Sequence, residues 1–318
     1  MKTAKTEQRN PHSRGLDRKP TLEILSVLNR EDARVALAVR RELPKIARAV
    51  RAIVKAFGSG GRLIYVGAGT SGRLAVLDAA ECPPTFGTSP KMVQAIIAGG
   101  ARALRHAAEG AEDSAPDGAK DLLRIKVSRN DVVVGIAASG STPYVLGALK
   151  LAKQRGAVTV GVTSNPRSPL ACQTQIAIAP DTGPEVITGS TRLKAGTAQK
   201  MVLNLLSTAA MVRIGRVYEN WMVHVALTNN KLRRRGARIL EEATGVDVST
   251  AEHALRQSGH NLPAALIRLQ TGASARAARK SLTATRGNVR LAMELATTMD
   301  REAEKDARRS KLKDQHDG

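Results

Sequence analysis

Five short, continuous apolar runs constrain the fold of this chain more than any other feature of its sequence. They lie at 63–66, 93–98, 131–137, 158–162 and 175–179, and segments of helical character separate several of them. Continuous apolar strands that alternate with helices are typical of a parallel sheet buried on both faces. The sequence therefore predicts an α/β fold in which a five-stranded parallel sheet is flanked by helices.

The remaining sequence is organised around this sheet. Strand-like runs stop after Asn229, and short Ala-, Arg- and Leu-rich segments punctuated by glycine follow, which favours a small helical domain. The four predicted regions are 1–58, an N-terminal arm and helices that pack on the sheet domain; 59–230, the sheet domain; 231–300, the helical C-terminal domain; and 301–318, a charged tail.

Capping and breaking residues give the helix boundaries. Residues 1–20 contain Asn-Pro, Ser and Gly and are predicted to be irregular. Thr21 is a predicted N-cap for a short helix that carries three leucines, Leu22, Leu25 and Leu28, on one face. The other predicted helices are 32–57, which Pro44 should kink or split, 73–80, 143–155 and 193–214.

Composition excludes several classes of protein. A hydrophobic content of 42% over 318 residues is enough for a sizeable core, whereas 2% aromatic residues argues against a protein that stacks nucleic-acid bases. Two cysteines, Cys82 and Cys172, exclude a disulfide scaffold, and the six histidines lack ligand spacing, so no metal site is predicted. The polar, basic first twenty residues and the absence of a long apolar run predict a cytoplasmic protein with no membrane partner.

The formal net charge of +22 has three possible meanings. Lys and Arg are spread along the whole chain, with one tight run at 233–235. This spread favours a solvated basic surface and predicts no nucleic-acid partner, although attraction of small anionic substrates and polyanion binding stay open.

The first segment that could bind a ligand is residues 67–72, Gly-Ala-Gly-Thr-Ser-Gly, which directly follows a predicted strand and opens a predicted helix. It matches the dinucleotide pattern G-x-G-x-x-G, but glycines 99–100 stand where an acid would hold the ribose. Hydroxyl groups beside free amide groups at a helix N-terminus suit a phosphate monoester, and a structural tight turn is the plain alternative. The candidate phosphate-binding residues here are Gly69, Thr70, Ser71 and Gly72.

A second and a third polar segment repeat this design. The strand at 131–137 runs into Ser139, Gly140, Ser141 and Thr142, with Pro143 suited to the first turn of a helix. Loops at the carboxyl ends of parallel strands can face one crevice, although ordinary helix caps would look the same. The third segment, 183–200, is rich in Ser, Thr and Gly, and its candidate substrate-binding residues are Glu185, Ser190 and Lys194.

Carboxylates between the first and third strands are candidates for proton transfer. Glu81 is followed by Cys-Pro-Pro, and we expect the two prolines to hold it at a helix end. Glu112 lies in a Glu-Gly-Ala-Glu-Asp segment. A single glutamate is usually a surface residue, but a pair of acids beside a phosphate crevice can supply a general acid and a general base.

These segments together resemble the sugar isomerase (SIS) fold and, within it, the N-acetylmuramic acid 6-phosphate etherase family. The likeness covers about 5–270, and the segments that carry it are 6–11, 60–87, 96–100, 108–113, 131–145 and 188–208. The helical end is similar to that family's ubiquitin-associated-like (UBA-like) C-terminal domain.

The resemblance implies a carbon–oxygen lyase that needs no metal or organic cofactor. It would convert N-acetylmuramic acid 6-phosphate into N-acetylglucosamine 6-phosphate and D-lactate in cell-wall sugar recycling. The family's two catalytic glutamates match Glu81 and Glu112. Glu81 would protonate the departing lactate and activate water, and Glu112 would remove the C2 proton of the ring-opened sugar. Such carboxylates call for partial burial, and Arg73, Arg192 or Lys194 could bind the lactyl carboxylate.

The chain departs from the family pattern at Ala75, Ala80, Ser141 and His224, where Gly, Ser, Arg and Asp are common. An SIS-fold phosphosugar isomerase and a non-catalytic sugar-phosphate-binding regulator are the alternative functions. The resemblance implies a homodimer. The predicted helix at 201–211 is apolar nearly all round, which also predicts that a second subunit or the C-terminal helices cover it.

Overall fold

A five-stranded parallel sheet is the core of the structure. The computed structural model describes residues 5–108 and 110–299, so the predicted charged tail at 301–318 lies outside the described residues. The strands are β1 (Leu63–Gly67), β2 (Val93–Ile97), β3 (Val132–Ile136), β4 (Val158–Val162) and β5 (Ile176–Ile178), and they pair in the order β2-β1-β3-β4-β5. Each strand falls on a predicted apolar run, so the predicted α/β fold is confirmed.

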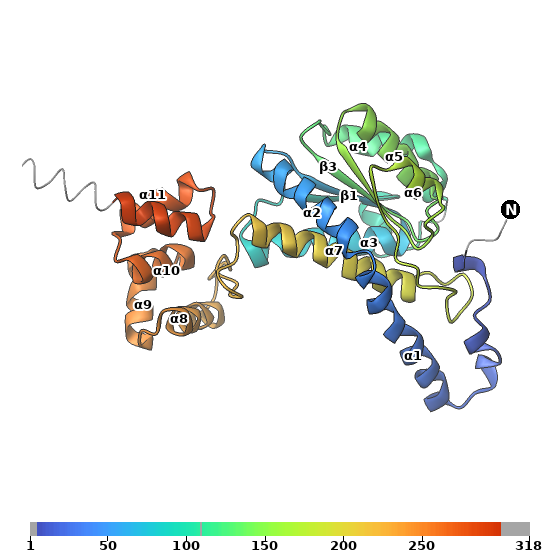
Figure 1. The fold of residues 1–318 in the computed structure, drawn as a ribbon, viewed down its shortest axis with the longest axis horizontal. Helices are drawn as coiled ribbons and strands as arrows, with labels where there is room; N and C mark the ends of the chain where they lie inside the picture. The colour runs from blue at the N-terminus through green and yellow to red at the C-terminus, as the bar shows by residue number, and fades with distance from the viewer. Residues whose placement is uncertain (1–4, 109, 300–318) are drawn as a thin grey trace, which may run out of the picture. The chain divides into compact units, whose positions relative to one another are not determined.

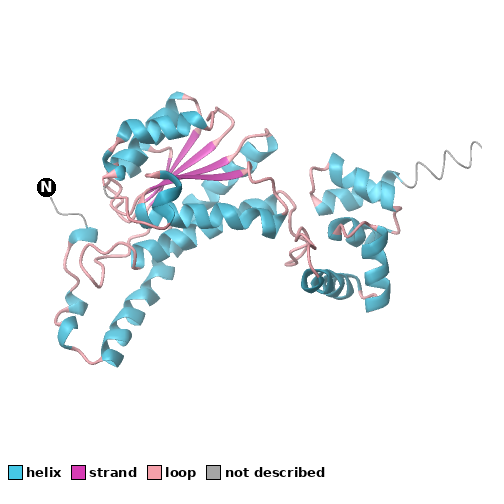
Figure 2. Ribbon diagram, turned by 180° about the vertical axis from the view of Figure 1, so that it is seen from behind, coloured by secondary structure: helices cyan, strands magenta, loops and turns pink. Residues whose placement is uncertain are grey.

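Helices cover both faces of the sheet (Figures 1 and 2). On one face, α5 (Pro143–Gln154) packs on β1, β3 and β4, and α4 (Ala115–Arg124) packs on α5. On the other face, α2 (Leu43–Gly58) contacts β1, β3 and β5 and lies with α3 (Gly69–Phe86) and α7 (Lys194–Arg213). The short helix α6 (Pro169–Gln173) and the 3₁₀ turns η1 (Lys5–Glu7), η2 (Pro11–Ser13), η3 (Leu16–Arg18), η4 (Gly100–Leu104) and η5 (Ala111–Asp113) complete this part of the chain.

The strand order reverses between β1 and β3. From β1 the chain crosses through α3 to β2 at one edge, whereas from β3 it crosses through α5 to β4 in the opposite direction. Loops that leave adjacent strands in opposite directions open a crevice at their carboxyl ends, which is where open α/β sheets bind ligands.

The first helix before the sheet differs from the prediction, and Thr21 is its first residue and not its N-cap. Pro44 lies in the first turn of α2, so the predicted break is confirmed. The separate short helix is wrong, because α1 runs unbroken over Thr21–Arg40 with Pro20 at its N-cap. Leu22 and Leu25 are 76% and 55% exposed on α1, so the predicted leucine face does not pack within the chain.

Helix α3 is longer than the sequence indicates. It continues to Phe86 and contains Pro83 and Pro84, so the prediction that these prolines hold Glu81 at a helix end is wrong. Both prolines lie in the last turn, where they remove two amide donors but their fixed φ is compatible with a helix. Glu81 therefore lies on the body of α3, more than a turn before its end.

The chain folds into two compact units. The first is Met1–Cys82 with Ser89–Ala210, and the second is Pro83–Thr88 with Met211–Gly318. The described helices of the second unit are α8 (Asn230–Thr244), α9 (Val248–Gln257), α10 (Leu262–Thr271), α11 (Ala275–Ala284) and a further helical segment at 289–299. Side chains of Asn229, Asp247, Asn261 and Ser274 cap the first four of these helices by accepting an amide hydrogen bond.

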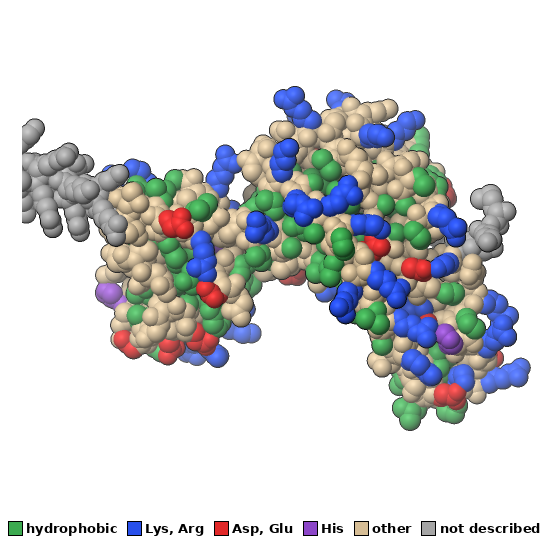
Figure 3. All heavy atoms as spheres, viewed as in Figure 1, with side chains coloured by type: hydrophobic (Ala, Val, Ile, Leu, Met, Phe, Trp, Pro, Cys, Tyr) green, Lys and Arg blue, Asp and Glu red, His purple; other side chains and the backbone are tan. Residues whose placement is uncertain are grey.

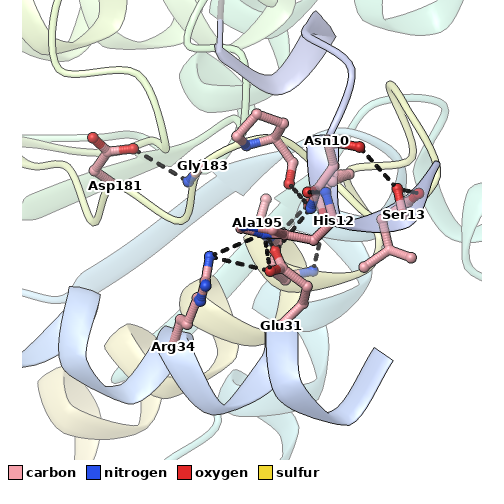
Figure 4. Close-up of polar contacts among 12 residues, drawn as sticks. Asn10, His12, Ser13, Glu31, Arg34, Asp181, Gly183 and Ala195 are labelled. Carbon is pink, nitrogen blue, oxygen red and sulfur yellow. Dashed lines mark hydrogen bonds and ion pairs between the residues drawn. The ribbon is translucent and has the colours of Figure 1, made fainter. Parts of the chain in front are cut away.

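A buried ion pair ties α1 to α7 in the first unit (Figure 4). The ammonium group of Lys194 donates to Glu31 at 2.6 Å, and the side chains are 1% and 3% exposed. Asn10 donates to the same carboxylate at 2.8 Å, and His12 and Arg34 lie at 3.0 and 3.1 Å from its other oxygen. Burial raises the pKa of Glu31, but the hydrogen bonds from Lys194, Asn10 and His12 and the charge of Lys194 outweigh burial and lower the pKa from 4.5 to about 2.

We expect Glu31→Gln to destabilise the chain by about 3–5 kcal/mol at pH 7, because it leaves the buried ammonium group of Lys194 without its counter-charge. Since the folded-state pKa of Glu31 is lowered, its contribution is present above about pH 4.5 and is lost as the pH falls towards 2. The difference in the free energy of unfolding between the parent and Glu31→Gln, measured by urea unfolding, should therefore become smaller as the pH falls through that range. Glu23→Gln removes an exposed partner of Lys19 on the same helix and should cost about 1 kcal/mol or less. An equal loss of unfolding free energy in both variants would contradict the stabilising role of Glu31.

Basic side chains are spread over many elements rather than gathered in one patch on the face drawn in Figure 3. This distribution agrees with the expectation of a solvated basic surface. Among the described residues, none of the helices combines the length and the apolar character needed to cross a bilayer.

Candidate active site

The first two predicted loops meet at the reversal of strand order. Strands β1 and β3 are neighbours in register, with Gly67 opposite Ile136 at their carboxyl ends. The first predicted loop is Ala68 and the first turn of α3, which directly follow β1, and the loop at 137–142 leaves β3. The sequence prediction that both loops lie at one edge of a parallel sheet is thus borne out by the register.

The loop after β1 brings hydroxyl and amide groups to the start of α3. Helix α3 begins at Gly69, so its first amide groups have no partner within the helix. Gly72 leaves no room for a side chain, because a Cβ there would lie 2.5 Å from Ile97. Ser71 is 9% exposed, and its hydroxyl donates to the side chain of Gln199 on α7 at 2.8 Å. These contacts fix the loop against β2 and α7.

The loop after β3 is held equally closely. Gly140 has a φ of +70°, and a Cβ there would lie 2.1 Å from the hydroxyl of Ser168, so only glycine fits. The hydroxyl of Ser141 donates to that of Ser139 at 3.0 Å. Thr142 is the N-cap of α5 but its side chain makes no capping hydrogen bond. Hydroxyl groups and the N-terminus of a helix therefore border this loop, an arrangement that suits an anionic oxygen.

Glu112 lines a cavity of about 170 Å³ beside the first loop. The other lining residues include Gly69 and Arg73 at the start of α3. The Arg73 guanidinium donates to the carbonyl oxygens of Leu104 and His106, both at 3.2 Å, and so holds the chain after η4 against α3. Glu112 itself is exposed on η5 and can reach solvent or a ligand.

Glu81 lines a different cavity, of about 380 Å³, between α3 and α7. Asp78 and Lys200 border the same cavity. Burial raises the pKa of Asp78, although hydrogen bonds from Tyr65 and Ser207 and the charge of Lys200 act against it. Glu81 is exposed. The cavity therefore combines an accessible carboxylate with a second, more buried carboxyl group and an ammonium group.

The two predicted catalytic glutamates do not share a cavity within one chain. The residues that line the Glu112 cavity and those that line the Glu81 cavity have no member in common. Glu81 lies about 18 Å further along α3 than Gly69, at a helical rise of about 1.5 Å per residue. The expected partial burial is also missing, since both side chains are exposed. A single chain thus places its two acids at separate sites.

Comparison with known proteins identifies the family. A curated protein from Serratia proteamaculans, named N-acetylmuramic acid 6-phosphate etherase, is 53% identical over 91% of this chain and 97% of its own length. The chain belongs to the N-acetylmuramic acid 6-phosphate etherase family. A relative of the same name from Yersinia pestis is 52% identical over 91% of this chain and 98% of its own length.

The chain also matches one family model and is similar to solved structures. Residues 45–153 match the model of the glucokinase regulatory protein N-terminal SIS domain. A solved phosphoheptose isomerase from Francisella tularensis is 17% identical, with a TM-score of 0.48, over 60% of this chain and 98% of its own. The family assignment made from the sequence motifs is confirmed, whereas the UBA-like label for the helical end stays a prediction.

The third predicted segment is built differently from the first two. Glu185 is 0% exposed and accepts the amide hydrogens of Lys194 and Ala195 at 3.0 and 2.9 Å, so it caps the start of α7. Lys194 pairs with Glu31 and has no exposed ammonium group. Ser190 is half-buried, so of this segment's three candidates it alone reaches the surface. The substrate-binding roles of Glu185, Ser190 and Lys194 stay predictions.

The N-terminal arm lies on this third segment within the same chain. Asn10 donates to the carbonyl oxygen of Pro184 at 3.1 Å, and Ser13 donates to that of Val186 at 2.7 Å. Of the cations considered for a lactyl carboxylate, Arg73 and Lys194 are engaged within the chain, whereas Arg192 is exposed and has no partner in the part of the chain that the structure describes. Arg192 is therefore the available cation beside this segment.

Sequence reasoning assigned no role to three residues around the site. Gln199, which holds Ser71, and Lys200, which borders the Glu81 cavity, lie inside the third segment but carried no separate signal. Asp78 precedes Glu81 by three positions, a spacing that puts both side chains on one face of a helix and could have paired them. Among residues 5–108 and 110–299, no group of His, Cys, Asp and Glu side chains is arranged to hold a metal ion.

Proposed function

We propose that this protein cleaves the D-lactyl ether of N-acetylmuramic acid 6-phosphate and releases D-lactate and N-acetylglucosamine 6-phosphate. The observation that carries this proposal is 53% identity, over 91% of the chain, to a curated etherase. The two hydroxyl-bearing loops at the strand reversal and the retained Glu81 and Glu112 support it. The substrate phosphate would bind the loops at 69–72 and 139–142, and Arg192 would bind the lactyl carboxylate.

The proposed chemistry uses the substrate's own aldehyde and needs no cofactor. Once the sugar ring opens, the C1 aldehyde acidifies the C2 proton, which Glu112 removes. The C3–oxygen bond then breaks, and Glu81 protonates the departing lactate. Water adds to C3 of the unsaturated aldehyde while Glu81 accepts its proton, and Glu112 returns a proton to C2. The sum is hydrolysis of the ether with both carboxyl groups restored.

We further propose that a second copy of the chain completes each site. This reaction needs both acids at one sugar, yet one chain keeps them in separate cavities. Leu77 lines the Glu81 cavity and is 50% exposed, so an apolar surface beside this acid is open to a partner. The apolar helix α7 gives no such support, because Val202, Leu203 and Leu206 are at most 1% exposed within the single chain. A homodimer in which Glu81 of one copy faces Glu112 of the other satisfies the chemistry, and the free thiols of Cys82 and Cys172 are compatible with a cytoplasmic enzyme.

The direct test is incubation of the purified protein with N-acetylmuramic acid 6-phosphate and an assay for D-lactate. Lactate release confirms the etherase. An SIS-fold isomerase would change an aldose phosphate into a ketose phosphate without releasing lactate. A regulator would bind the sugar phosphate and convert nothing. Either of these results would overturn the proposal.

We expect Ser139→Ala to raise KM about tenfold or more, because it removes a hydrogen bond to a charged phosphate: the Ser139 hydroxyl accepts from Ser141 and keeps its own hydrogen to donate. Since that contact is the same in the ground and transition states, kcat should change by about twofold at most. Ser26→Ala on α1 removes an exposed hydroxyl and should change neither constant. Loss of kcat without a change in KM would contradict the phosphate role. The parent should also turn over the dephosphorylated sugar poorly.

A further inference from the structure

The second unit contains a cavity that the proposed reaction does not use. Its volume is about 580 Å³, within the range of small-molecule sites. Residues from four segments line it: Gly87 after α3, Arg216 and His224 before α8, His260 and Asn261 at the start of α10, and Arg286 after α11. Two arginines and two histidines line the cavity, and none of its lining residues is acidic.

Arg216 is the cation that lacks a counter-charge in this cavity. Its guanidinium donates one hydrogen bond, to the carbonyl oxygen of Arg286 at 3.1 Å. Within the described chain no acidic side chain pairs with Arg216, and its buried Nε has no hydrogen-bond partner. Burial lowers the pKa of Arg216, which reflects a cation removed from water without a compensating acid. A half-buried cation of this kind is stabilised by an anion.

His224 adds a neutral polar group beside Arg216. Its Nε2 lies 2.9 Å from the carbonyl oxygen of Gly287, so that nitrogen carries the hydrogen and donates it. Burial and the charge of Arg216 lower the pKa of His224 from 6.5 to about 4. The ring is therefore neutral at pH 7 and leaves the charge of Arg216 uncompensated, while Nδ1 can accept a hydrogen bond from a hydroxyl group.

Two further features add positive potential at the rim. Helix α10 begins at Leu262, so its N-terminal end, which carries a partial positive charge, borders the cavity. His260 and Arg286 have φ values of +57° and +53°, which non-glycine residues rarely adopt. Strained backbone of this kind concentrates at ligand sites, and two of the four such residues in the described chain line this one cavity.

We propose that this cavity is a second anion site, which binds a small molecule bearing a phosphate or carboxylate group through Arg216, Arg286 and His260. The apolar side chains of Leu262, Pro263 and Leu282 would contact the body of that molecule. The site is distinct from the two loops at the strand reversal, because none of its lining residues belongs to them. It therefore does not depend on the proposed etherase reaction.

Histidine resonances of the full chain provide the test. The chain has six histidines, and two of them line the cavity. In protein labelled with ¹⁵N-histidine at pH 7.5, inorganic phosphate should shift the ring signals of His224 and His260, which His224→Gln and His260→Gln assign. Acetate at equal ionic strength tests carboxylate recognition, and chloride should shift neither signal.

Arg216→Gln should weaken the phosphate response about tenfold to a hundredfold, since it removes a half-buried charge-assisted contact. His224→Asp is a second variant, because its carboxylate would pair with Arg216 and displace the ligand, an effect read at His260. Arg279→Gln removes the same charge from an exposed position on α11 that does not line the cavity, and should leave the response unchanged. Circular dichroism checks that each variant is folded. Absence of any phosphate or acetate shift in the parent, or equal weakening by Arg279→Gln, would overturn the proposal.

Discussion

Glu81→Gln and Glu112→Gln are each expected to give a folded protein that releases D-lactate about 10²–10⁴-fold more slowly than the parent, the usual contribution of general acid–base catalysis. Both side chains are exposed, so the exchange of a carboxylate for an amide of the same shape should change the free energy of unfolding by about 0.5 kcal/mol or less. The loss should therefore appear in kcat and not in the unfolding midpoint. Asp113→Asn, on the residue next to Glu112, is the matched control and should keep parental activity.

The two variants should differ in deuterated water. If Glu112 removes the C2 proton, Glu81→Gln still exchanges that proton for deuterium in unreacted substrate, whereas Glu112→Gln does not. Mass spectrometry of recovered substrate measures the exchange. The reverse pattern would exchange the two roles, and activity within about twofold of the parent in either variant would remove that residue from the mechanism.

The sheet and its two loops were predictable because they depend on local signals. Each strand is a short buried run, each crossover helix has its own periodicity, and parallel pairing then places the carboxyl ends of β1 and β3 side by side. The glycines at 72 and 140 stand out in the sequence, and in the structure they leave room for the side chains of Ile97 and Ser168. For this reason the two candidate phosphate-binding segments could be located from the sequence alone.

The buried ion pair was not predictable from local signals. Glu31 and Lys194 are separated by 163 positions, and each looks like an ordinary surface residue in its own helix. Helix α1 runs unbroken through Glu31, whose side chain faces Lys194 and not water. Lys194 was assigned to the substrate for the same reason, since a lysine in a polar segment gives no sign of a buried partner.

The sequence also did not show that Glu81 and Glu112 lie in separate cavities of one chain. The prolines after Glu81 indicated a helix end, which would have brought this acid close to the chain that follows. Because α3 instead continues through Pro83 and Pro84, Glu81 stays on the side of the helix that borders α7. Motif spacing identifies two acids of one reaction but does not tell whether one chain or two bring them together.

A mixture of two inactive variants is expected to recover activity if the site is shared between two copies. Glu81→Gln and Glu112→Gln chains, denatured together and refolded at equal concentration, should form hybrid dimers as about half of all dimers. In each hybrid, Glu112 of one copy faces Glu81 of the other at one site, and both acids are missing at the second site. About a quarter of all sites are then intact, so D-lactate release should return to about a quarter of the parental rate.

The control for this experiment is the double variant Glu81→Gln/Glu112→Gln refolded with parental chains. Its hybrids combine one intact and one altered acid at every site, so activity should come from parental dimers alone, again about a quarter. Light scattering must show a mass near twice 33.7 kDa for each sample. If the two single variants stay inactive when mixed while the control reaches about half of the parental rate, each chain uses its own two glutamates, because every parental chain then stays active inside a hybrid. The sugar would then have to bind with α3 and η5 rearranged, because the separate cavities of Glu81 and Glu112 cannot both reach one C2–C3 bond.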